Sequence, residues 1–345
     1  MTTSPRRLTP RRLTGLALLA SAAVFATTAC SSGAGAPAAE SDGDWSAVTV
    51  EHAFGSTEIT AEPKRVVTIG WSDEATLLEL GVVPVGMAAS TYAGDEDGYL
   101  PWDLEKLDEL GEDKPELFNT DDGMPVEDIA ALEPDLILGL QSGLEEKEYE
   151  QLSAVAPTIP YLDEPWKTPW QDATLAIGKA LGREDDAQKV VDETEGHIAD
   201  LAAEHPEFEG TTVAAATVVP NSTDFGFYLE GDARAALLEE LGFTRAPFID
   251  ELEADEGAFF APLSREHADR VDTDVLLMWH STPEEREKLE KSDVFGEIGA
   301  VADGRYVGYD DPAEAMAISS PNPLTIPWVS DRLVDDLAEA VEGEA

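Results

Sequence analysis

Aromatic side chains follow several predicted strands of this chain, where they could form a binding surface. A parallel sheet places its functional loops at the carboxyl ends of its strands, so side chains in those loops converge on one site. The pattern therefore predicts a cleft that presents aromatic faces to a ligand. The aromatic candidates are Trp71, Tyr92, Trp102, Phe225, Phe227, Tyr228, Phe259, Phe260 and Trp279, and all of them except Phe227 and Phe259 are proposed as ligand contacts.

Residues that could perform catalysis occur only as adjacent acids, such as Ser72-Asp73-Glu74 and Asp121-Asp122. The chain has 72 acidic residues, so neighbouring acids are expected from composition alone and are interpreted as solvated surface. The acidic segment 94–98 lacks the ligand spacing of an EF-hand and is interpreted in the same way. Neither a nucleophile elbow nor a phosphate-binding glycine loop is present. The sequence therefore favours a binding protein, and a secreted hydrolase is the alternative from the class of enzymes.

The histidines do not form a close pair anywhere in the sequence. Zinc sites are built from a small number of His, Cys and acidic ligands held together. A receptor for bare zinc or manganese is therefore not indicated. A haem receptor would need a Tyr or His that faces the haem, and no pattern selects one. The five histidines are His52, His197, His205, His267 and His280.

Cys30, the only cysteine among 345 residues, ends a segment typical of an export signal. Residues 1–29 contain four arginines and no acid, and their apolar run over 16–26 is too short to cross a bilayer. A lone cysteine has no disulfide partner within the chain, so we expect Cys30 to carry a lipid that anchors the mature protein outside the cell membrane. Ordinary cleavage near Ala29 is the alternative. Paired arginines leave both Sec and twin-arginine export open.

The chain is strongly acidic, with a formal charge of −50, and loss of the basic leader makes it more negative. Such a surface repels nucleic acid and anionic head groups, so it favours neutral or cationic ligands. A saline habitat is a second explanation for this acidity. The hydrophobic fraction of 43% is typical of a folded protein, and the length suits two domains. We expect a monomer that touches the membrane through its lipid only.

Strand and helix patterns alternate in the first half of the chain. A β-branched run over 65–70 precedes a helical pattern over 74–80 and a second strand over 82–86. A helix over 126–132 then precedes an apolar strand over 134–139. This alternation predicts a mostly parallel sheet covered by helices on both faces.

The second half repeats this plan, and the aromatic segment 225–228 is expected to be a loop within it. The predicted elements are strands over 211–219, 274–279 and 305–309 and helices over 233–241 and 330–341.

An uninterrupted helical pattern over 183–204 separates the two halves. About 20 residues of helix span ~30 Å, which suits a strut between two lobes, although a surface helix within one domain would show the same pattern. The predicted fold is α/β, with two Rossmann-like lobes of mostly parallel sheet joined by one long helix. The predicted segments are a leader (1–29), a tether (30–47), an N-terminal lobe (48–182), an inter-lobe helix (183–205) and a C-terminal lobe (206–345).

From about His52 to the C-terminus, the order and spacing of several segments resemble those of the iron-siderophore substrate-binding lipoproteins of ABC importers. That class includes the ferric hydroxamate and cobalamin receptors. The resemblance implies two α/β lobes joined by one long helix, with the ligand bound between them and no enzymatic activity. A cobalamin or haem receptor of the same fold is the alternative. The segments that carry the resemblance are 50–67, 71–75, 77–81, 127–137, 263–266 and 303–307.

Glu127 and Glu266 begin corresponding helices in the two halves. An acid at a helix start is favourable on electrostatic grounds alone, so local stabilisation is one interpretation. In the family that the chain resembles, one glutamate in each lobe pairs with arginines of the importer's membrane subunits. The resemblance therefore implies that Glu127 and Glu266 dock the receptor on an ABC importer permease.

The resemblance also implies what the cleft holds. The iron of a ferric siderophore is already fully coordinated, so the protein needs no cofactor and no direct metal ligand, only aromatic faces and a few hydrogen-bond donors. The hydroxamate receptor of the family carries tryptophans at places similar to Trp71 and Trp102. That receptor also contacts the hydroxamate oxygens through an arginine of its first lobe. The corresponding stretch of this chain, residues 117–121, contains no arginine, and Asn119 and Gln141 are the substitutes that we consider.

Few bases lie in the first half of the chain, and none falls in the predicted strand-end loops. A ferric catecholate with three negative charges would need a cluster of bases. The sequence therefore favours a neutral or cationic hydroxamate, such as a ferrioxamine. The bases between Arg65 and Lys167 are Lys106, Lys114 and Lys147.

Overall fold

The computed structural model describes residues 45–219, 222–255 and 257–343. The expected leader 1–29, Cys30 and all of the expected tether 30–47 except its last three residues lie outside these ranges. Within the described ranges, none of the helices combines the length and apolar composition that a membrane span requires.

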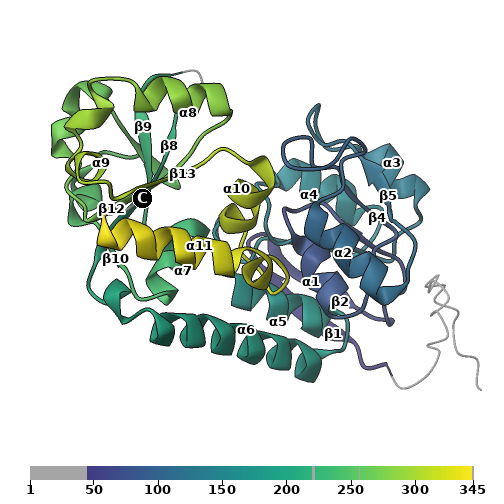
Figure 1. The fold of residues 1–345 in the computed structure, drawn as a ribbon. Coiled ribbons are helices and arrows are strands. Elements are labelled where there is room, and N and C mark those ends of the chain that lie inside the picture. The colour runs from purple at the N-terminus through teal and green to yellow at the C-terminus, as the bar shows by residue number, and fades with distance from the viewer. Residues whose placement is uncertain (1–44, 220–221, 256, 344–345) are drawn as a thin grey trace, which may run out of the picture. The chain divides into compact units, whose positions relative to one another are not determined.

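The N-terminal lobe is built on a sheet of five parallel strands with helices between them (Figure 1). In the order of pairing, the strands are β5 (Glu116–Phe118), β4 (Gly86–Ala88), β3 (Val66–Thr68), β6 (Leu136–Gly139) and β7 (Thr158–Pro160). The helices are α1 (Asp73–Glu79), α2 (Pro101–Leu110), α3 (Val126–Ala131), α4 (Glu146–Ser153) and α5 (Trp170–Ala180). An antiparallel hairpin of β1 (Val48–His52) and β2 (Gly55–Ile59) precedes this sheet.

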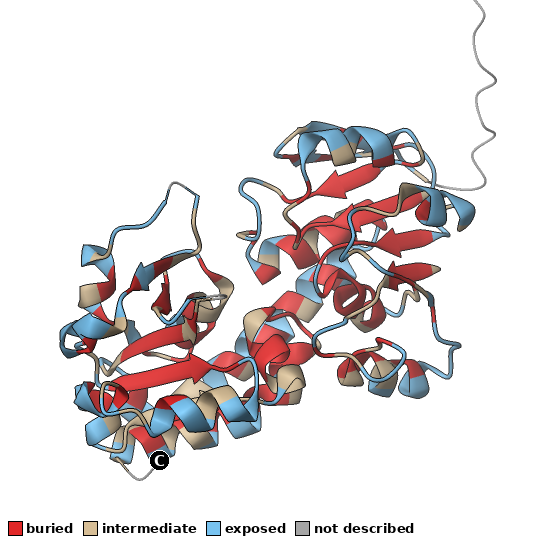
Figure 2. Ribbon diagram, turned by 90° about the horizontal axis from the view of Figure 1, so that it is seen from above, coloured by how far each residue is buried: buried red, intermediate tan, exposed pale blue. Residues whose placement is uncertain are grey.

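Strands β3 and β6 pair with each other at the centre of this sheet and are buried along their whole length. Figure 2 shows that the strands of both lobes are largely buried, whereas many helices have an exposed face. Their apolar sequences explain this burial, since a parallel sheet covered on both faces needs apolar residues on both sides. The predicted strand over 82–86 is displaced, because β4 begins only at Gly86. Pro84 has no amide hydrogen to donate to a neighbouring strand, which accounts for the later start.

The C-terminal lobe contains a second sheet, in which parallel and antiparallel strands are mixed. Its strands are β8 (Thr212–Val218), β9 (Phe225–Tyr228), β10 (Thr244–Arg245), β11 (Phe260–Leu263), β12 (Val275–Trp279) and β13 (Tyr306–Tyr309), paired in the order β11-β9-β8-β12-β13 with β10 also on β8. The α-helices are α7 (Ala233–Glu240), α8 (Pro283–Glu290), α9 (Gly299–Ala302), α10 (Pro312–Ser319) and α11 (Thr325–Glu342). Short 3₁₀ segments are η1 (Pro206–Phe208), η2 (Pro247–Glu251), η3 (Arg265–Arg270) and η4 (Phe295–Glu297).

Strand β9 corrects the prediction of a loop over 225–228. It pairs antiparallel with β8 on one side and with β11 on the other. Side chains alternate along a strand, so Phe225 and Phe227 enter one apolar cluster while Tyr228 enters the other. The segment predicted to be a loop is therefore an interior strand of the sheet, between β11 and β8.

Helix α6 (Glu184–Glu204) connects the two lobes and confirms the predicted strut. Its 21 residues correspond to ~30 Å of helix. Its buried side chains are Ala187, Val191, Thr194 and Ile198, spaced close to the helical period so that they form one stripe. In Figure 1, α6 runs past both lobes below α5 and α11.

The end of the chain makes a second, non-covalent connection between the lobes. Trp328 of α11 packs edge-on against Trp102 of α2, with ring centroids 5.3 Å apart. The side chain of Ser320, just after α10, donates a hydrogen bond of 3.3 Å to the backbone oxygen of Trp71. One apolar cluster consequently contains residues from both lobes.

Candidate functional site

The candidate site begins where the strand order of the N-terminal sheet reverses. Strand β3 pairs with β4 on one side and with β6 on the other, so the loops after β3 and β6 diverge and leave a crevice. Trp71 follows β3 and Gln141 follows β6. The amide of Trp71 donates to the backbone oxygen of Gln141 at 2.8 Å, so the two loops are fixed to each other at this point.

Asp73 strengthens the same junction from the start of α1. Its carboxylate accepts hydrogen bonds from the amides of Leu140 at 2.9 Å and Gln141 at 3.4 Å. Gly70 makes this approach possible, because a Cβ atom there would lie 2.3 Å from Oδ2 of Asp73. The position of Trp71 is therefore determined by backbone contacts and a buried carboxylate.

Trp166, in the loop after β7, forms an aromatic pair with Trp71 at a centroid distance of 5.2 Å. Its backbone has a φ of 64°, an uncommon conformation for a bulky residue. Its indole lies against Gly143, where any Cβ atom would come within 2.4 Å of Nε1. The two tryptophans thus form a fixed aromatic corner on the N-terminal lobe.

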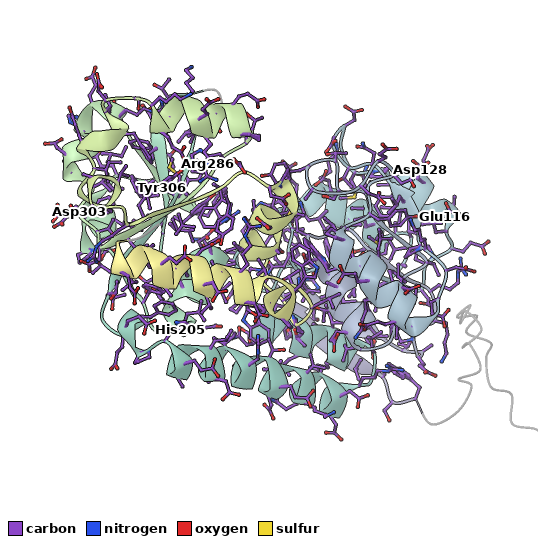
Figure 3. All side chains as sticks on the ribbon, viewed as in Figure 1. Glu116, Asp128, His205, Arg286, Asp303 and Tyr306 are labelled. Atoms are coloured by element: carbon purple, nitrogen blue, oxygen red, sulfur yellow. The ribbon has the colours of Figure 1, made fainter. Side chains whose placement is uncertain are left out.

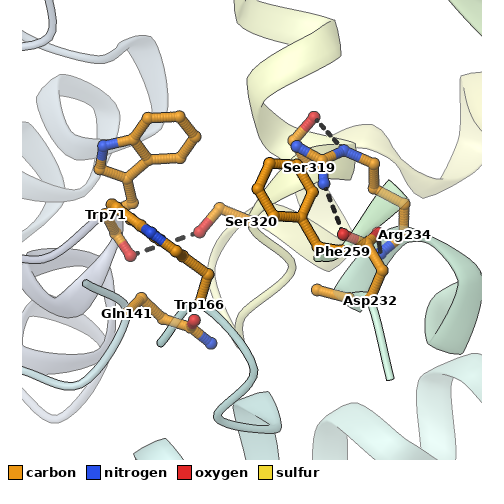
Figure 4. Close-up of a pocket in the computed structure, with 9 residues that line it drawn as sticks. Trp71, Gln141, Trp166, Asp232, Arg234, Phe259, Ser319 and Ser320 are labelled. Atoms are coloured by element: carbon orange, nitrogen blue, oxygen red, sulfur yellow. Dashed lines mark hydrogen bonds and ion pairs between the residues drawn. The ribbon is translucent and has the colours of Figure 1, made fainter. Parts of the chain in front are cut away.

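Arg234, in the first turn of α7, supplies a positive charge from the C-terminal lobe. Nη1 donates to Asp232 at 2.9 Å and Nε donates to Ser319 at 3.0 Å (Figure 4). The guanidinium also lies over the ring of Tyr228, 4.2 Å from its centroid. These contacts use two of the five N–H bonds of the guanidinium, so other donors remain on the pocket side of the residue.

Three adjoining pockets, with volumes of about 260, 200 and 300 Å³, meet at Trp71. Each of them takes residues from both lobes, although the second has only Met316 from the C-terminal lobe. The first lies between the tryptophan corner and Arg234, as Figure 4 shows. Together they form a cleft between the lobes, with aromatic and apolar walls that also carry one arginine, several acids, an amide and hydroxyl groups.

The exposed apolar side chains gather at this cleft. Among the described residues, four large hydrophobic side chains are exposed: Trp71 and Tyr92 at 47%, and Leu110 and Trp166 at 37%. All of these except Leu110 line the cleft. A concentrated exposed aromatic surface is costly in water unless a ligand covers it, so it marks a binding site.

Six of the residues that the sequence proposed as ligand contacts come together here. Each lines at least one of the three pockets. They are Trp71, Tyr92, Gln141, Tyr228, Phe260 and Trp279.

The other three proposed contacts do not reach the cleft. Trp102 is 1% exposed and packs in the apolar cluster that joins the lobes, because the amphipathic start of α2 turns it inward. Phe225 is also 1% exposed, since strand alternation points it away from Tyr228 and into the other core. Asn119 is exposed, but its side chain closes a local turn by accepting a hydrogen bond from the amide of Asp121.

Several cleft residues were not among the proposed contacts. Trp166 and Arg234 are the most consequential, and the aromatic candidate Phe259 also lines the cleft. Serines 319 and 320 reach the cleft only because the loop after α10 returns to the N-terminal lobe. The one available sequence signal was Trp166, a tryptophan in a polar, proline-rich loop.

Three carboxyl groups are buried beside the cleft. Asp73 and Glu74 of α1 are 1% and 4% exposed, and Asp103 of α2 is completely buried. The interpretation of residues 72–74 as solvated surface is therefore wrong, because the first turn of α1 is packed below the strand ends. Burial raises the pKa of Asp73 to about 7 and that of Asp103 to about 8. Burial and the neighbouring Asp103 both raise the pKa of Glu74.

Among the residues that the structure describes, no group of three or more His, Cys, Asp or Glu side chains is arranged to hold a metal ion. The cleft offers aromatic surface, one guanidinium, hydroxyl groups and the carboxyl groups of Glu74, Asp121 and Asp232.

Glu127 and Glu266 lie at topologically corresponding places. Glu127 is in the first turn of α3, which precedes β6, and Glu266 is in the first turn of η3, which precedes β12. Both side chains are exposed. Asp128, the neighbour of Glu127, projects from the outer side of the N-terminal lobe in Figure 3. Neither glutamate lines the cleft.

A family model described as periplasmic binding protein matches residues 66–313. A curated relative from Bacillus subtilis (strain 168), the probable siderophore-binding lipoprotein YfiY, is 29% identical over 275 residues. That alignment covers 76% of this chain and 80% of the relative.

Two solved structures share the fold over most of the chain. PiaA of Streptococcus pneumoniae TIGR4, in complex with ferrichrome, has 33% sequence identity and a TM-score of 0.78, covering 86% of this chain and 99% of that one. A periplasmic solute binding protein of Mycobacterium smegmatis has 29% identity and a TM-score of 0.73 with the same coverage.

Proposed function

Because this chain belongs to the periplasmic binding protein family, we propose that it is the receptor of an ABC importer and that its cargo is a ferric siderophore of the hydroxamate type. The observation that carries the proposal is the cleft in which Trp71, Tyr92 and Trp166 are exposed opposite a single arginine. The names of its relatives support the same cargo, since YfiY is described as siderophore-binding and PiaA was crystallised with ferrichrome.

The chemistry of the cleft fits a complex whose metal is already coordinated. A ferric trihydroxamate is compact and partly apolar, so the aromatic walls can replace its hydration water. Its iron-bound oxygens carry partial negative charge, and the N–H donors of Arg234 are suited to them. A ferric tricatecholate carries three negative charges, and a cleft with one guanidinium and several acids would not neutralise them. The receptor works by binding and delivery.

Fluorescence titration tests this assignment, because Trp71 and Trp166 both line the cleft. We expect ferrioxamine B to quench the emission at least about 100-fold more tightly than a ferric tricatecholate, given the cost of like-charge juxtaposition. Cobalamin and haemin serve as further ligands in the same assay. Tight quenching by the catecholate alone would refute the hydroxamate type, and tight quenching by cobalamin or haemin alone would refute a siderophore.

Docking on the permease is assigned to Glu127 and Glu266. Both are exposed and begin helical segments at corresponding places in the two lobes, so they can present one negative charge each to a two-sided membrane partner. A receptor held at two points is also oriented, which a single contact would not achieve.

Changing both residues to alanine should reduce cellular uptake of labelled ferric siderophore to below roughly a tenth while leaving ligand affinity unchanged, since paired interfacial charges supply binding and orientation. The matched control is Glu116→Ala with Glu297→Ala, which removes one exposed glutamate from each lobe elsewhere. Uptake at the level of this control would rule out the docking role.

The lipid anchor is assigned to Cys30, which lies outside the described residues. A lipid on Cys30 would keep the receptor at the extracytoplasmic face of the membrane, within reach of the permease. The description of YfiY as a lipoprotein supports this placement.

A further inference from the structure

The 200 Å³ pocket beside Trp71, here called the acidic pocket, differs chemically from the rest of the cleft. It lies between the loops after β3, β4 and β5, with Met316 of α10 as its contribution from the other lobe. Its charged lining residues are Glu74 and Asp121, and it contains no lysine or arginine. Arg234 lines the other two pockets but not this one.

The acidic pocket contains buried polar groups that lack a hydrogen-bond partner or a counter-charge among the described residues. Ser72 lines the pocket, is 4% exposed, and its Oγ has no hydrogen-bond partner among the described residues. Glu74 also lines the pocket and is equally buried. Both carboxylate oxygens of Asp103, the residue whose charge raises the pKa of Glu74, are unpartnered in the described structure.

No basic side chain of the surrounding helices neutralises these acids. Helices α1 and α2 contain one base between them, Lys106, and it pairs with Glu79 at 2.9 Å and Glu109 at 3.6 Å. Burial raises the pKa of Glu74, so an ammonium group from a ligand would stabilise the ionised form that burial disfavours.

The remaining walls indicate what kind of cation fits. Ala88, Leu100 and Met316 supply apolar surface along the pocket. Its polar lining residues are Ser72, Glu74, Ser90, Thr91, Thr120 and Asp121. An alkyl chain that ends in an ammonium group matches this division, because its methylene groups would contact the apolar wall and its three N–H donors would meet oxygen acceptors.

From this arrangement we propose that the acidic pocket is a subsite for the alkylammonium arm of the ligand, with Glu74 as its counter-ion and Ser72 as a second acceptor. The inference rests on the proposed function and narrows it: the cargo is a ferric hydroxamate that carries a primary amine. The iron chelate itself occupies the larger space between Trp166 and Arg234.

Two chelates that differ only in this amine test the proposal on the mature protein. Ferrioxamine B carries a pendant primary ammonium group, and its N-acetyl derivative has the same iron centre without that charge. We expect the native protein to bind ferrioxamine B about tenfold or more tightly than the acetylated form, as measured by calorimetry. Equal affinities for the two chelates would overturn the amine subsite while leaving the hydroxamate assignment intact.

The Glu74→Gln variant tests whether Glu74 causes the preference for ferrioxamine B. Glu74→Gln keeps the size of the side chain but removes its charge, so it should abolish the preference for ferrioxamine B and leave affinity for the acetylated form within about twofold. Asp122→Asn makes the same change of net charge at an exposed neighbouring position and should retain the preference. Loss of affinity for both chelates to the same extent in Glu74→Gln would contradict the specific role of Glu74.

If neither chelate binds, the hydroxamate assignment is refuted. The amine subsite can still be tested in that case with a small alkylammonium ion as the probe. n-Pentylammonium should shift the indole N–H resonance of Trp71 in the native protein, whereas n-pentanol should not, and Glu74→Gln should remove the shift. Equal shifts from the amine and the alcohol would show that the pocket does not select charge.

Discussion

An Arg234→Met variant should bind ferrioxamine B about 100-fold more weakly than the native protein, because the charge-assisted hydrogen bonds that we propose between its guanidinium and the chelate would be lost. The guanidinium is held by Asp232 and Ser319 and stacked on Tyr228, so its remaining donors are fixed in the cleft before the ligand arrives. Such preorganisation means that little conformational entropy is lost on binding. Titration of tryptophan fluorescence measures the effect.

The loss of Arg234 also leaves Asp232 buried without its partner, which by itself destabilises the fold. The double variant Asp232→Asn with Arg234→Met removes both charges and separates ligand affinity from stability. The matched control is Arg270→Met, which removes an exposed arginine from the same lobe. If the folded double variant binds within about threefold of the native protein, Arg234 does not contact the ligand.

An Asp103→Asn variant should be more stable than the native protein at pH 8, by on the order of 3 kcal/mol. Burial raises the pKa of Asp103 to about 8, whereas in the unfolded chain it is about 3.9. At pH values between these two pKa values, Asp103 is protonated in the folded protein but ionised in the unfolded chain. The resulting stability is present in acid and is lost as pH rises toward 8. Asparagine cannot ionise, so the variant avoids this loss.

Urea unfolding at pH 5, 6, 7 and 8 tests the prediction. The native free energy of unfolding should fall with pH, and the difference between native protein and Asp103→Asn should grow in the same direction. Asp73 and Glu74, whose pKa values are also raised by burial, will leave part of the pH dependence in the variant. Asp108→Asn, an exposed acid of the same helix, is the control. Parallel pH profiles for Asp103→Asn and the native protein would contradict the assignment.

Most of the architecture was predictable because its elements have simple local patterns. The apolar runs at β3, β6, β8 and β12 lie within the predicted strands, and the stripe on α6 has helical spacing. Strand β9 was missed because its four residues, Phe-Gly-Phe-Tyr, contain glycine and are too few to show alternation. Its place between β8 and β11 depends on pairing with residues up to 38 positions away.

The site was predictable only in part. Trp71 and Tyr92 could be placed because they directly follow parallel strands. Trp102 follows a strand too, but helix α2 turns it into the core. Arg234 lies within the predicted helix over 233–241, and only the tertiary packing of α10 brings Ser319 to it. Nothing in the local sequence distinguishes Glu74, which is buried, from the many exposed acids.

The single passage of the chain through α6 has a consequence for the order of folding. Every strand of the N-terminal sheet lies between Val66 and Pro160, and every strand of the C-terminal sheet lies between Thr212 and Tyr309. Each sheet can therefore be completed from one continuous stretch of chain, and such units fold separately, in the order of synthesis. The contact between Trp102 and Trp328 spans most of the chain, so it closes last. The cleft is thus the final part of the protein to assemble, from two halves that are already folded.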